Sequence, residues 1–326
     1  MEQQSQSAPT TRIVEPSMRV NALFQIALGL SMDRSARTRS MGDLRFTLGS
    51  VRDGAYQQTL SLANGDYDLA FAVAKGEMDV AAINPSCFLS MAYRGKGLYP
   101  EALPVRVIAT MPSLDVMLFA VSKKTGITSL ADIAEKRYPL KVSVRRAPIH
   151  GTRFVVDQVF DAHGFSIKDL ESWGGSVHYG ESPTDPGRLA GVRDGTIDAV
   201  FDEGVRGWAP LALEHGMAFL DLDPVSRARL DQVGWAAVLV RSALPEYTGD
   251  AMAPSFSGWP IFTRASLDDD LAYNMCLALE GGRERVVWDA EEPVTMADIC
   301  RGTEAAPRDV PLHPGAERFY KERGYL

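Results

Sequence analysis

The sequence predicts an α/β protein built from two similar lobes. Strand-like and helix-like segments alternate along much of the chain, as is typical of α/β folds with mainly parallel sheets. Two stretches, 73–82 and 192–201, also resemble each other, because each ends a helical pattern at a glycine and enters an apolar strand through an aspartate. The 326 residues suffice to bury two medium cores. Two such lobes typically hold a ligand between them.

The elements are predicted from their apolar patterns. Short apolar, β-branched runs indicate strands, and apolar residues at helical spacing indicate helices. Ser129 caps the start of one helix, and residues 1–17 are expected to be a tail that leads into a first strand. The predicted strands are 11–14, 44–48, 79–84, 105–110, 116–122, 141–145 and 198–201, and the predicted helices are 20–30, 56–75, 129–136, 152–163, 208–215, 267–280 and 315–323.

The composition argues against some classes of partner. A net charge of −8 disfavours nucleic acid and anionic membranes, whereas a small anionic ligand would respond to local charge. No segment reaches the run of about 18 apolar residues that spans a membrane, so no direct membrane insertion is expected. The three cysteines form neither a Cys-x-x-Cys motif nor a Cys/His cluster and are expected to be buried free thiols: Cys87, Cys276 and Cys300.

The motifs point to no cofactor and no metal. The five histidines lack the His-x-x-x-His and Glu-x-x-His spacings of metal sites. A nucleophile elbow, a Walker loop and a complete dinucleotide fingerprint are also missing. These absences favour binding over catalysis without excluding an enzyme.

The location of the protein depends on the start of the chain. The only candidate signal segment begins at Met18, but it lacks a small-residue cleavage site and fits an amphipathic helix better. A cytoplasmic protein is expected if this sequence is the native full length, and a periplasmic one if a signal peptide was removed.

The sharpest candidate site is the turn at residues 143–153, where a strand ends and a helix begins. Backbone N–H groups at a helix N-terminus bind carboxylate or phosphate oxygens. Gly151 lets a ligand approach the backbone, the Thr152 hydroxyl can cap the helix or donate, and His150 is a candidate for ligand contact or acid–base chemistry. One of three guanidinium groups is expected to grip a carboxylate, on Arg145, Arg146 or Arg153. The alternative is an ordinary N-cap with surface arginines.

Polar residues at other strand ends extend this candidate site. In the first lobe, a glycine-serine turn at Gly49 and Ser50 precedes a predicted helix, and Tyr56 is placed to stack on or hydrogen-bond a ligand. The two matched strands end in polar groups, which would point toward one crevice if the lobes face each other. These groups are Asn84 and Ser86, suited to neutral hydrogen bonds, and Asp202 and Glu203, which would receive an ammonium group, transfer a proton or cap the next helix.

A resemblance to a known family gives these patterns a context. The strand 116–122, followed by Gly126-Ile127-Thr128-Ser129-Leu130-Ala131-Asp132-Ile133, looks like the crossover of type 2 periplasmic binding proteins. Three further segments are similar to the TAXI family: the glycine-to-aspartate turn at residues 76–79, the turn at 145–153 and the ending Pro311-Leu312-His313-Pro314-Gly315-Ala316-Glu317-Arg318-Phe319-Tyr320. This family comprises the solute-binding receptors of TRAP-type transporters.

The resemblance implies a two-lobed Venus-flytrap fold with a ligand cleft between lobes joined by two hinge strands. Lobe one would comprise residues 1–120 and 241–326, and lobe two residues 121–240. The implied ligand is a small organic carboxylate or an amino-acid-like solute, and the implied partners are TRAP membrane subunits if the protein is exported. The implied contacts in lobe one are Gly49, Ser50, Tyr56, Asn84 and Ser86, and those in lobe two are His150, Gly151, Thr152 and Arg153.

A cytoplasmic enzyme on the same fold is the alternative. A cofactor-independent decarboxylase for an aromatic or small acid needs an arginine to hold the carboxylate and an acid to supply a proton. Arg145 or Arg153, Glu203 and His150 would fill these roles. A cytoplasmic sensor module is a third possibility, for which the sequence shows no partner surface.

Overall fold

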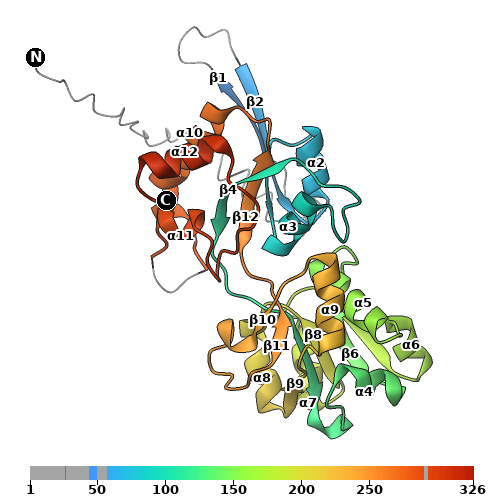
Figure 1. Cartoon of the computed structure of the whole chain (residues 1–326). Helices are drawn as coiled ribbons and strands as arrows, with labels where there is room; N and C mark the ends of the chain where they lie inside the picture. The colour runs from blue at the N-terminus through green and yellow to red at the C-terminus, as the bar shows by residue number, and fades with distance from the viewer. Residues whose placement is uncertain (1–25, 27–43, 50–56, 290–292) are drawn as a thin grey trace, which may run out of the picture.

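Two α/β lobes stacked one above the other make up the part of the chain that the structure describes (Figure 1). The structure is a computed structural model, and it describes residues 26, 44–49, 57–289 and 293–326. The predicted tail, the strand 11–14, the helix 20–30 and the candidate ligand residues Ser50 and Tyr56 lie outside the described residues. The predicted fold class, two α/β lobes joined by hinge strands, is confirmed. The expectation of mainly parallel sheets is wrong: both sheets are mixed, because the strand that enters each lobe from the other runs antiparallel to its neighbours.

The first lobe contains a mixed five-stranded sheet in the order β1-β2-β3-β12-β4. Strand β2 pairs antiparallel with β1 and parallel with β3, and β12 runs antiparallel to both β3 and β4. Helices α2 and α3 cover one face, and α10, α11 and α12 cover the other (Figure 1). The strands are β1 (Leu44–Gly49), β2 (Gln57–Gly65), β3 (Val80–Ile83), β4 (Val105–Met111) and β12 (Trp259–Arg264).

The second lobe repeats this plan with its own mixed five-stranded sheet, in the order β7-β6-β8-β5-β9. Strand β6 is parallel to β7 and β8, and β5 is antiparallel to β8 and β9. The strands are β5 (Leu118–Ser122), β6 (Lys141–Arg145), β7 (Ser176–Gly180), β8 (Ala199–Asp202) and β9 (Met217–Phe219), and a separate pair consists of β10 (Ala237–Leu239) and β11 (Met252–Pro254).

Helices fill both faces of the sheets. Helices α4 to α9 belong to the second lobe, with α5 packed beside α9. The bounds are α2 (Leu69–Lys75), α3 (Ser86–Arg94), α4 (Leu130–Glu135), α5 (Gly151–Ala162), α6 (Ile167–Ser172), α7 (Pro186–Asp194), α8 (Ala209–Glu214), α9 (Pro224–Val233), α10 (Asp269–Gly282), α11 (Met296–Cys300) and α12 (Pro314–Glu322). Within the described residues, no helix is long and apolar enough to cross a membrane.

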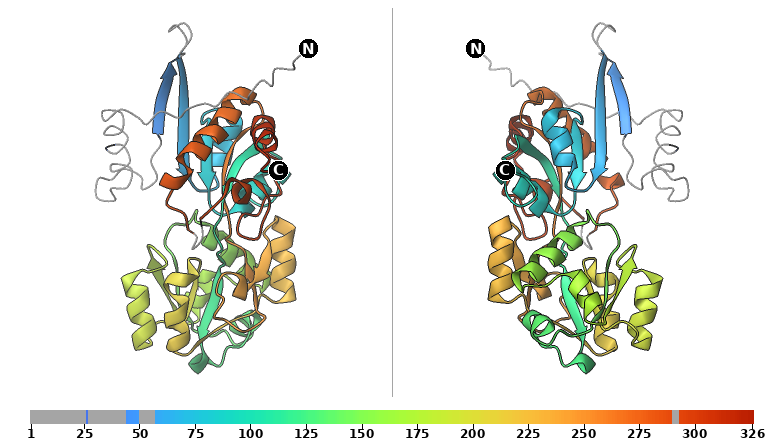
Figure 2. Two further views of the ribbon diagram at one scale, coloured as in Figure 1. Left: turned by 90° about the vertical axis from the view of Figure 1, so that its left-hand side faces the viewer. Right: turned by 90° about the vertical axis from the view of Figure 1, so that its right-hand side faces the viewer.

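The chain passes between the lobes twice, and the two crossovers lie side by side (Figures 1 and 2). The first crossover, residues 112–117, links β4 to β5, and the second, residues 255–258, links β11 to β12. They pair through an antiparallel bridge between Val116 and Ser255, and the Phe256 N–H donates to the Asp115 carbonyl at 2.9 Å. Each crossover feeds a strand that runs antiparallel to its neighbours inside the sheet it enters.

The second sheet separates two hydrophobic cores, and the side chains of β5 point alternately into each of them. Phe119 and Val121 belong to the main core, which extends through both lobes, whereas Leu118 and Ala120 belong to a second core. This alternation follows from the two-residue period of a strand. The second core also contains Val240, Leu244 and Ala253, so these side chains pack with lobe two. The division of the chain at residues 120/121 and 240/241 stays a proposal.

The repeated turn is built as the sequence indicates. Gly76 and Gly195 end α2 and α7 in the left-handed conformation, with φ of 76° and 74°, which glycine adopts without steric cost. The aspartate that follows each glycine accepts hydrogen bonds from a neighbouring strand: Asp79 from the Ser61 N–H, and Asp198 from the Lys141 N–H. Both aspartates are therefore structural.

The helix predicted at residues 56–75 is confirmed only in its C-terminal part. Residues 57–65, which we expected to be helical within 56–75, form strand β2, and only Leu69–Lys75 form a helix. In β2, Leu60 and Ala63 are both buried although successive side chains of a strand point to opposite faces, so both faces of the strand are partly covered. Its pairing with β1 and β3 outweighs a weak local helical pattern.

Candidate functional site

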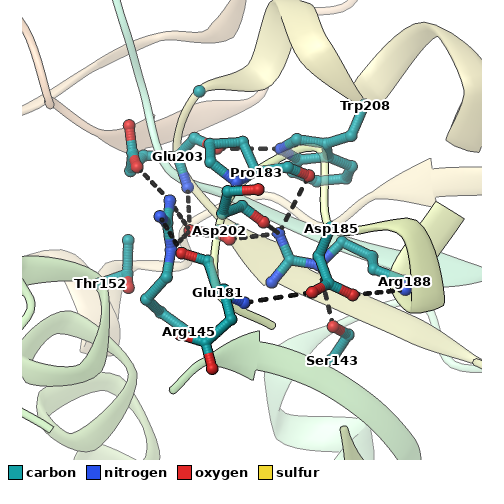
Figure 3. A network of polar contacts seen from close by, with 12 residues as sticks. Ser143, Arg145, Thr152, Glu181, Pro183, Asp185, Arg188, Asp202, Glu203 and Trp208 are labelled. Atoms are coloured by element: carbon teal, nitrogen blue, oxygen red, sulfur yellow. Dashed lines mark hydrogen bonds and ion pairs between the residues drawn. The ribbon is translucent and has the colours of Figure 1, made fainter. Parts of the chain in front are cut away.

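A buried group of charged side chains lies at the carboxyl end of the second sheet (Figure 3). We call Asp115, Arg145, Arg188, Asp202 and Glu203 the acid–guanidinium cluster. Strands β6 and β8 pair in parallel with Ser143 opposite Val200, and continuing this register brings Arg145 beside Asp202. The sheet therefore places a cation and an anion, 57 residues apart in the chain, at adjacent strand ends.

Asp202 is the centre of the cluster. It is fully buried, and its Oδ1 accepts from Arg145 Nε at 3.3 Å and from Arg145 Nη2 at 3.1 Å. Its Oδ2 accepts from Arg188 Nη1, and the Glu203 N–H donates to Oδ1 at 2.9 Å. A buried carboxylate in this position is stabilised by its paired guanidinium groups, because burial without partners would be costly.

Arg188 is a member of the cluster that the sequence did not suggest. It comes from α7, is fully buried, and donates from Nε to Ser143 Oγ at 2.9 Å. Its Nη1 also donates to the Ser182 and Pro183 carbonyls, each at 3.2 Å. The sequence Pro186-Gly187-Arg188 looks like an ordinary helix start. Only the burial of Arg188 in the folded protein reveals the role of this residue.

Glu203 and Asp115 form an acid pair at the edge of the cluster. Glu203 accepts from Arg145 Nη2, and its carboxyl group is hydrogen-bonded to Asp115. Burial, followed by the charges of Asp115 and Asp202, raises the pKa of Glu203 well above its ordinary value, so Glu203 holds the proton that the pair shares. Asp115, which the sequence did not suggest either, accepts from the Gly204 N–H at 2.7 Å and the Val205 N–H at 3.3 Å. It fastens the first crossover to the candidate site.

The N-terminus of α5 lies next to this acid pair. His150 is the N-cap, and its Nδ1 accepts from the Thr152 N–H at 3.3 Å and lies 3.0 Å from Thr152 Oγ1. Burial, followed by the charge of Arg145, lowers the pKa of His150 to about 4. The ring is therefore neutral near pH 7, and since Nδ1 accepts, its proton is on Nε2. This Nε2 lies 3.9 Å from Glu203 Oε1.

The three arginines of the predicted anion-binding turn have different surroundings. Arg145 is occupied by the cluster, and Arg146 is an exposed residue paired with Glu181. Arg153 donates from Nη1 to the Arg145 carbonyl at 3.3 Å and lies over the Tyr179 ring, 5.5 Å from its centroid. Its Nε is buried without a partner in the described part of the chain. Arg153 is thus the arginine with donor capacity left for a ligand.

Asn84 and Ser86 follow β3 in the first lobe. The Oδ1 atom of Asn84 is buried and has no hydrogen-bond partner among the residues that the structure describes. Ser86 begins α3, and both its N–H and its hydroxyl donate to the Gly258 carbonyl, at 2.8 and 3.0 Å, so it holds the second crossover. Buried polar atoms are normally paired, so the lone Asn84 oxygen indicates a place for a donor.

Gly49 is not brought to this site. It pairs with Gln57 at the start of β2, whereas the other end of β2, at Gly65, pairs with Ile83 beside Asn84. Those two ends of β2 are about 26 Å apart at about 3.3 Å per residue. Gly49 therefore lies at the opposite end of the sheet from the candidate site.

Aromatic rings join the lobes beside the start of α5. A β-carbon at Gly151 would lie 3.2 Å from the rings of Phe88, in α3 of lobe one, and Phe256, in the second crossover. Trp235 packs against both of these rings, with centroids 5.2 Å from each, and against Phe154 at 5.7 Å. A side chain at Gly151 would therefore require these two rings to shift by a few tenths of an ångström.

Trp235 also lines a pocket between the lobes. It has a volume of about 450 Å³, within the usual range for small-molecule sites. Its floor includes Ser86, Cys87 and Ser90 of α3, together with Trp235 and Ser255. Ser86, a member of the predicted ligand set, lines this pocket.

Cys87, Cys276 and Cys300 are buried free thiols, as predicted.

Within the described residues, no group of three or more His, Cys, Asp or Glu side chains is arranged to hold a metal ion. The carboxyl groups of Asp202 and Glu203 are instead paired with arginines.

Solved structures of several binding proteins are similar to this chain at low identity. ProX of Borrelia burgdorferi, a glycine betaine and L-proline-binding protein, is 17% identical over 63% of this chain and 64% of its own length, with a TM-score of 0.36. XAC2383 from Xanthomonas citri, bound to chloride, is 14% identical over 79% of this chain and 80% of its own, with a TM-score of 0.39. Lactococcal OpuAC with glycine betaine is 12% identical over 79% and 82%, with a TM-score of 0.35.

A family model matches far more of the sequence than any local motif does. The model of the NMT1-like family matches residues 51–324, a range that contains lobe two, both crossovers, the whole acid–guanidinium cluster and all of the described lobe one except residue 26, β1 and the C-terminal two residues. The chain therefore belongs to the NMT1-like family.

Proposed function

We propose that this protein binds a small carboxylate, of the amino-acid type, between its lobes and acts as a solute receptor. The observation that carries the proposal is the N-terminus of α5, which is buried at the contact between the lobes. The His150 Nε2–H group and the positive end of the helix dipole are both suited to a carboxylate, whereas the buried Thr152 hydroxyl donates to His150 Nδ1. Arg153, with its buried unpaired Nε, adds a cation to this side.

The opposite lobe offers a complementary group. Asn84 presents a buried oxygen without a donor partner in the described part of the chain. An ammonium or amide group of the ligand would satisfy it, because an unpaired buried acceptor is costly. Lobe two thus offers hydrogen-bond donors, and lobe one offers an acceptor. This arrangement favours a ligand that has both a carboxylate and an N–H donor, such as an amino acid.

The transport role rests on the sequence. The turns at 76–79 and 145–153 and the C-terminal ending resemble the TAXI receptors, so we propose that a TRAP-type membrane transporter is the partner if the protein is exported. Membership of the NMT1-like family is compatible with this role.

The first experiment is a binding screen. Thermal unfolding is followed with L-glutamate, succinate and benzoate, and any stabilising compound is then measured by isothermal titration calorimetry. We expect the amino acid to stabilise the protein most, because it satisfies both lobes. Mass spectrometry of ligand released from purified protein identifies the natural solute. Failure of all three probes, together with protein that carries no carboxylate, would contradict the proposal.

A decarboxylase-like enzyme is the second candidate, and one observation favours it. Glu203 holds a proton beside the neutral His150, as a general acid would. Prolonged incubation with the bound solute separates the two functions. Recovery of the solute unaltered supports a receptor, whereas release of carbon dioxide supports the enzyme.

A further inference from the structure

We propose that Glu203 occupies on Arg145 the place of a ligand carboxylate, and that a carboxylate ligand binds by displacing the Glu203 side chain. This inference rests on the proposed function, because it names the residue that competes with the solute. It makes Glu203 a determinant of specificity, since a ligand must bind Arg145 better than an internal carboxyl group does.

Of the two acids on Arg145, only Glu203 is free to leave. Asp202 is fully buried and is held by Arg145, Arg188 and the Glu203 N–H. Glu203 lies at the edge of the cluster, with 12% of its side chain exposed, on the loop that follows β8. Because that loop is anchored through the Gly204 and Val205 N–H groups, the Glu203 side chain can rotate away while its backbone stays in place.

The position that Glu203 would vacate is suited to an anion. Its Oε1 contacts Arg145 Nη2 and lies 3.9 Å from His150 Nε2, at the N-terminus of α5. A ligand carboxylate there would accept from a guanidinium and an imidazole N–H, and would lie at the positive end of a twelve-residue helix. A carboxylate that is not tethered to the chain can move closer to His150 than Glu203 does.

The charges of the cluster also favour the exchange. The groups that face Glu203 are Arg145 from β6, Asp202 from β8, His150 at the start of α5 and Asp115 from the first crossover. With Glu203 protonated and His150 neutral, the two guanidinium groups of the cluster balance the carboxylates of Asp115 and Asp202. An incoming carboxylate therefore meets no excess of negative charge.

Acetate tests this inference without knowledge of the natural solute. In Glu203→Ala, the position on Arg145 is open, and acetate should bind there about tenfold or more tightly than to the wild type, since one charge-assisted hydrogen bond is gained. Thermal unfolding with increasing acetate is compared with sodium chloride at equal ionic strength. The control is Glu181→Ala, which removes an exposed carboxylate paired with Arg146 and should show no gain.

Two milder substitutions keep the test valid if the alanine variant does not fold. Glu203→Asp shortens the side chain by one methylene and should show a smaller gain in acetate binding, whereas Glu203→Gln, which can still accept from Arg145, should show none. Equal acetate binding by the wild type, Glu203→Ala and Glu203→Asp would overturn the inference, even if the wild type binds a carboxylate in the screen. Tighter acetate binding by the Ala variant supports it, even if the screen fails and the proposed function is abandoned.

Discussion

Gly151 of lobe two lies directly against the Phe88 ring of lobe one. A β-carbon on this glycine would come within 3.2 Å of Phe88 Cε2 and Cζ. Since Gly151 is also the first residue of α5, the close approach of the lobes depends on the same residue that begins the candidate anion site.

Gly151→Val should therefore hold the lobes apart. The added methyl groups have no room beside Phe88 and Phe256, and such overpacking costs about 1–3 kcal/mol. We expect ligand affinity to fall about tenfold or more and the radius of gyration in small-angle X-ray scattering to increase. Gly282→Ala, at a helical position with no atom within 4 Å of the new β-carbon, is the control and should change neither quantity. An unchanged affinity in the valine variant would show that the contact is not needed for binding.

Asp202→Ala should destabilise the protein strongly. It leaves Arg145 and Arg188 as buried cations without their shared carboxylate, and breaking such a buried pair costs about 3–5 kcal/mol. The free energy of unfolding in urea measures this loss. Asp250→Ala, which removes an exposed ion pair with Arg241, should change it little. Similar losses in both variants would mean that the buried cluster contributes no more than a surface pair.

Glu203 should make stability depend on pH. Its pKa in the folded protein is raised well above 4.5, so the folded state holds this proton more tightly than the unfolded chain does. The resulting stabilisation is fully present below pH 4.5 and is lost as the pH rises toward and through the raised pKa. Between pH 5 and 8, the wild type should therefore lose stability relative to Glu203→Gln, measured by urea unfolding across the range. A constant difference between the two proteins would refute the assigned proton.

Arg153→Ala should weaken binding of whichever probe carboxylate stabilises the wild type most. The guanidinium group adjoins the first turn of α5, and its Nε is buried and unpaired among the described residues. Loss of a charge-assisted hydrogen bond should lower the affinity about tenfold in calorimetry. Arg146→Ala, which removes an exposed cation from the same turn, is the matched control. Equal affinities for the two variants would place the carboxylate elsewhere.

Local signals in the sequence predicted much of the fold. Apolar runs located β3, β4, β6 and β8 to within a residue or two, and glycines marked the ends of α2 and α7. These features depend on the conformational preferences of a few neighbouring residues, which the sequence states directly. The strand β2 was missed because its alternation is short and its stability comes from pairing with β1 and β3.

The sequence by itself determined the two-lobed α/β class, the turn at the start of α5 and the polar residues that end β3 and β8. The tertiary structure alone decided how these groups are paired. It brought Asp115 and Arg188 to the cluster, placed Gly49 at the far end of its sheet, and engaged Arg145 with Asp202 and Glu203. Strand register and crossover topology join residues that are far apart in the chain, and burial then fixes which charges must pair. Neither of these leaves a local pattern in the sequence.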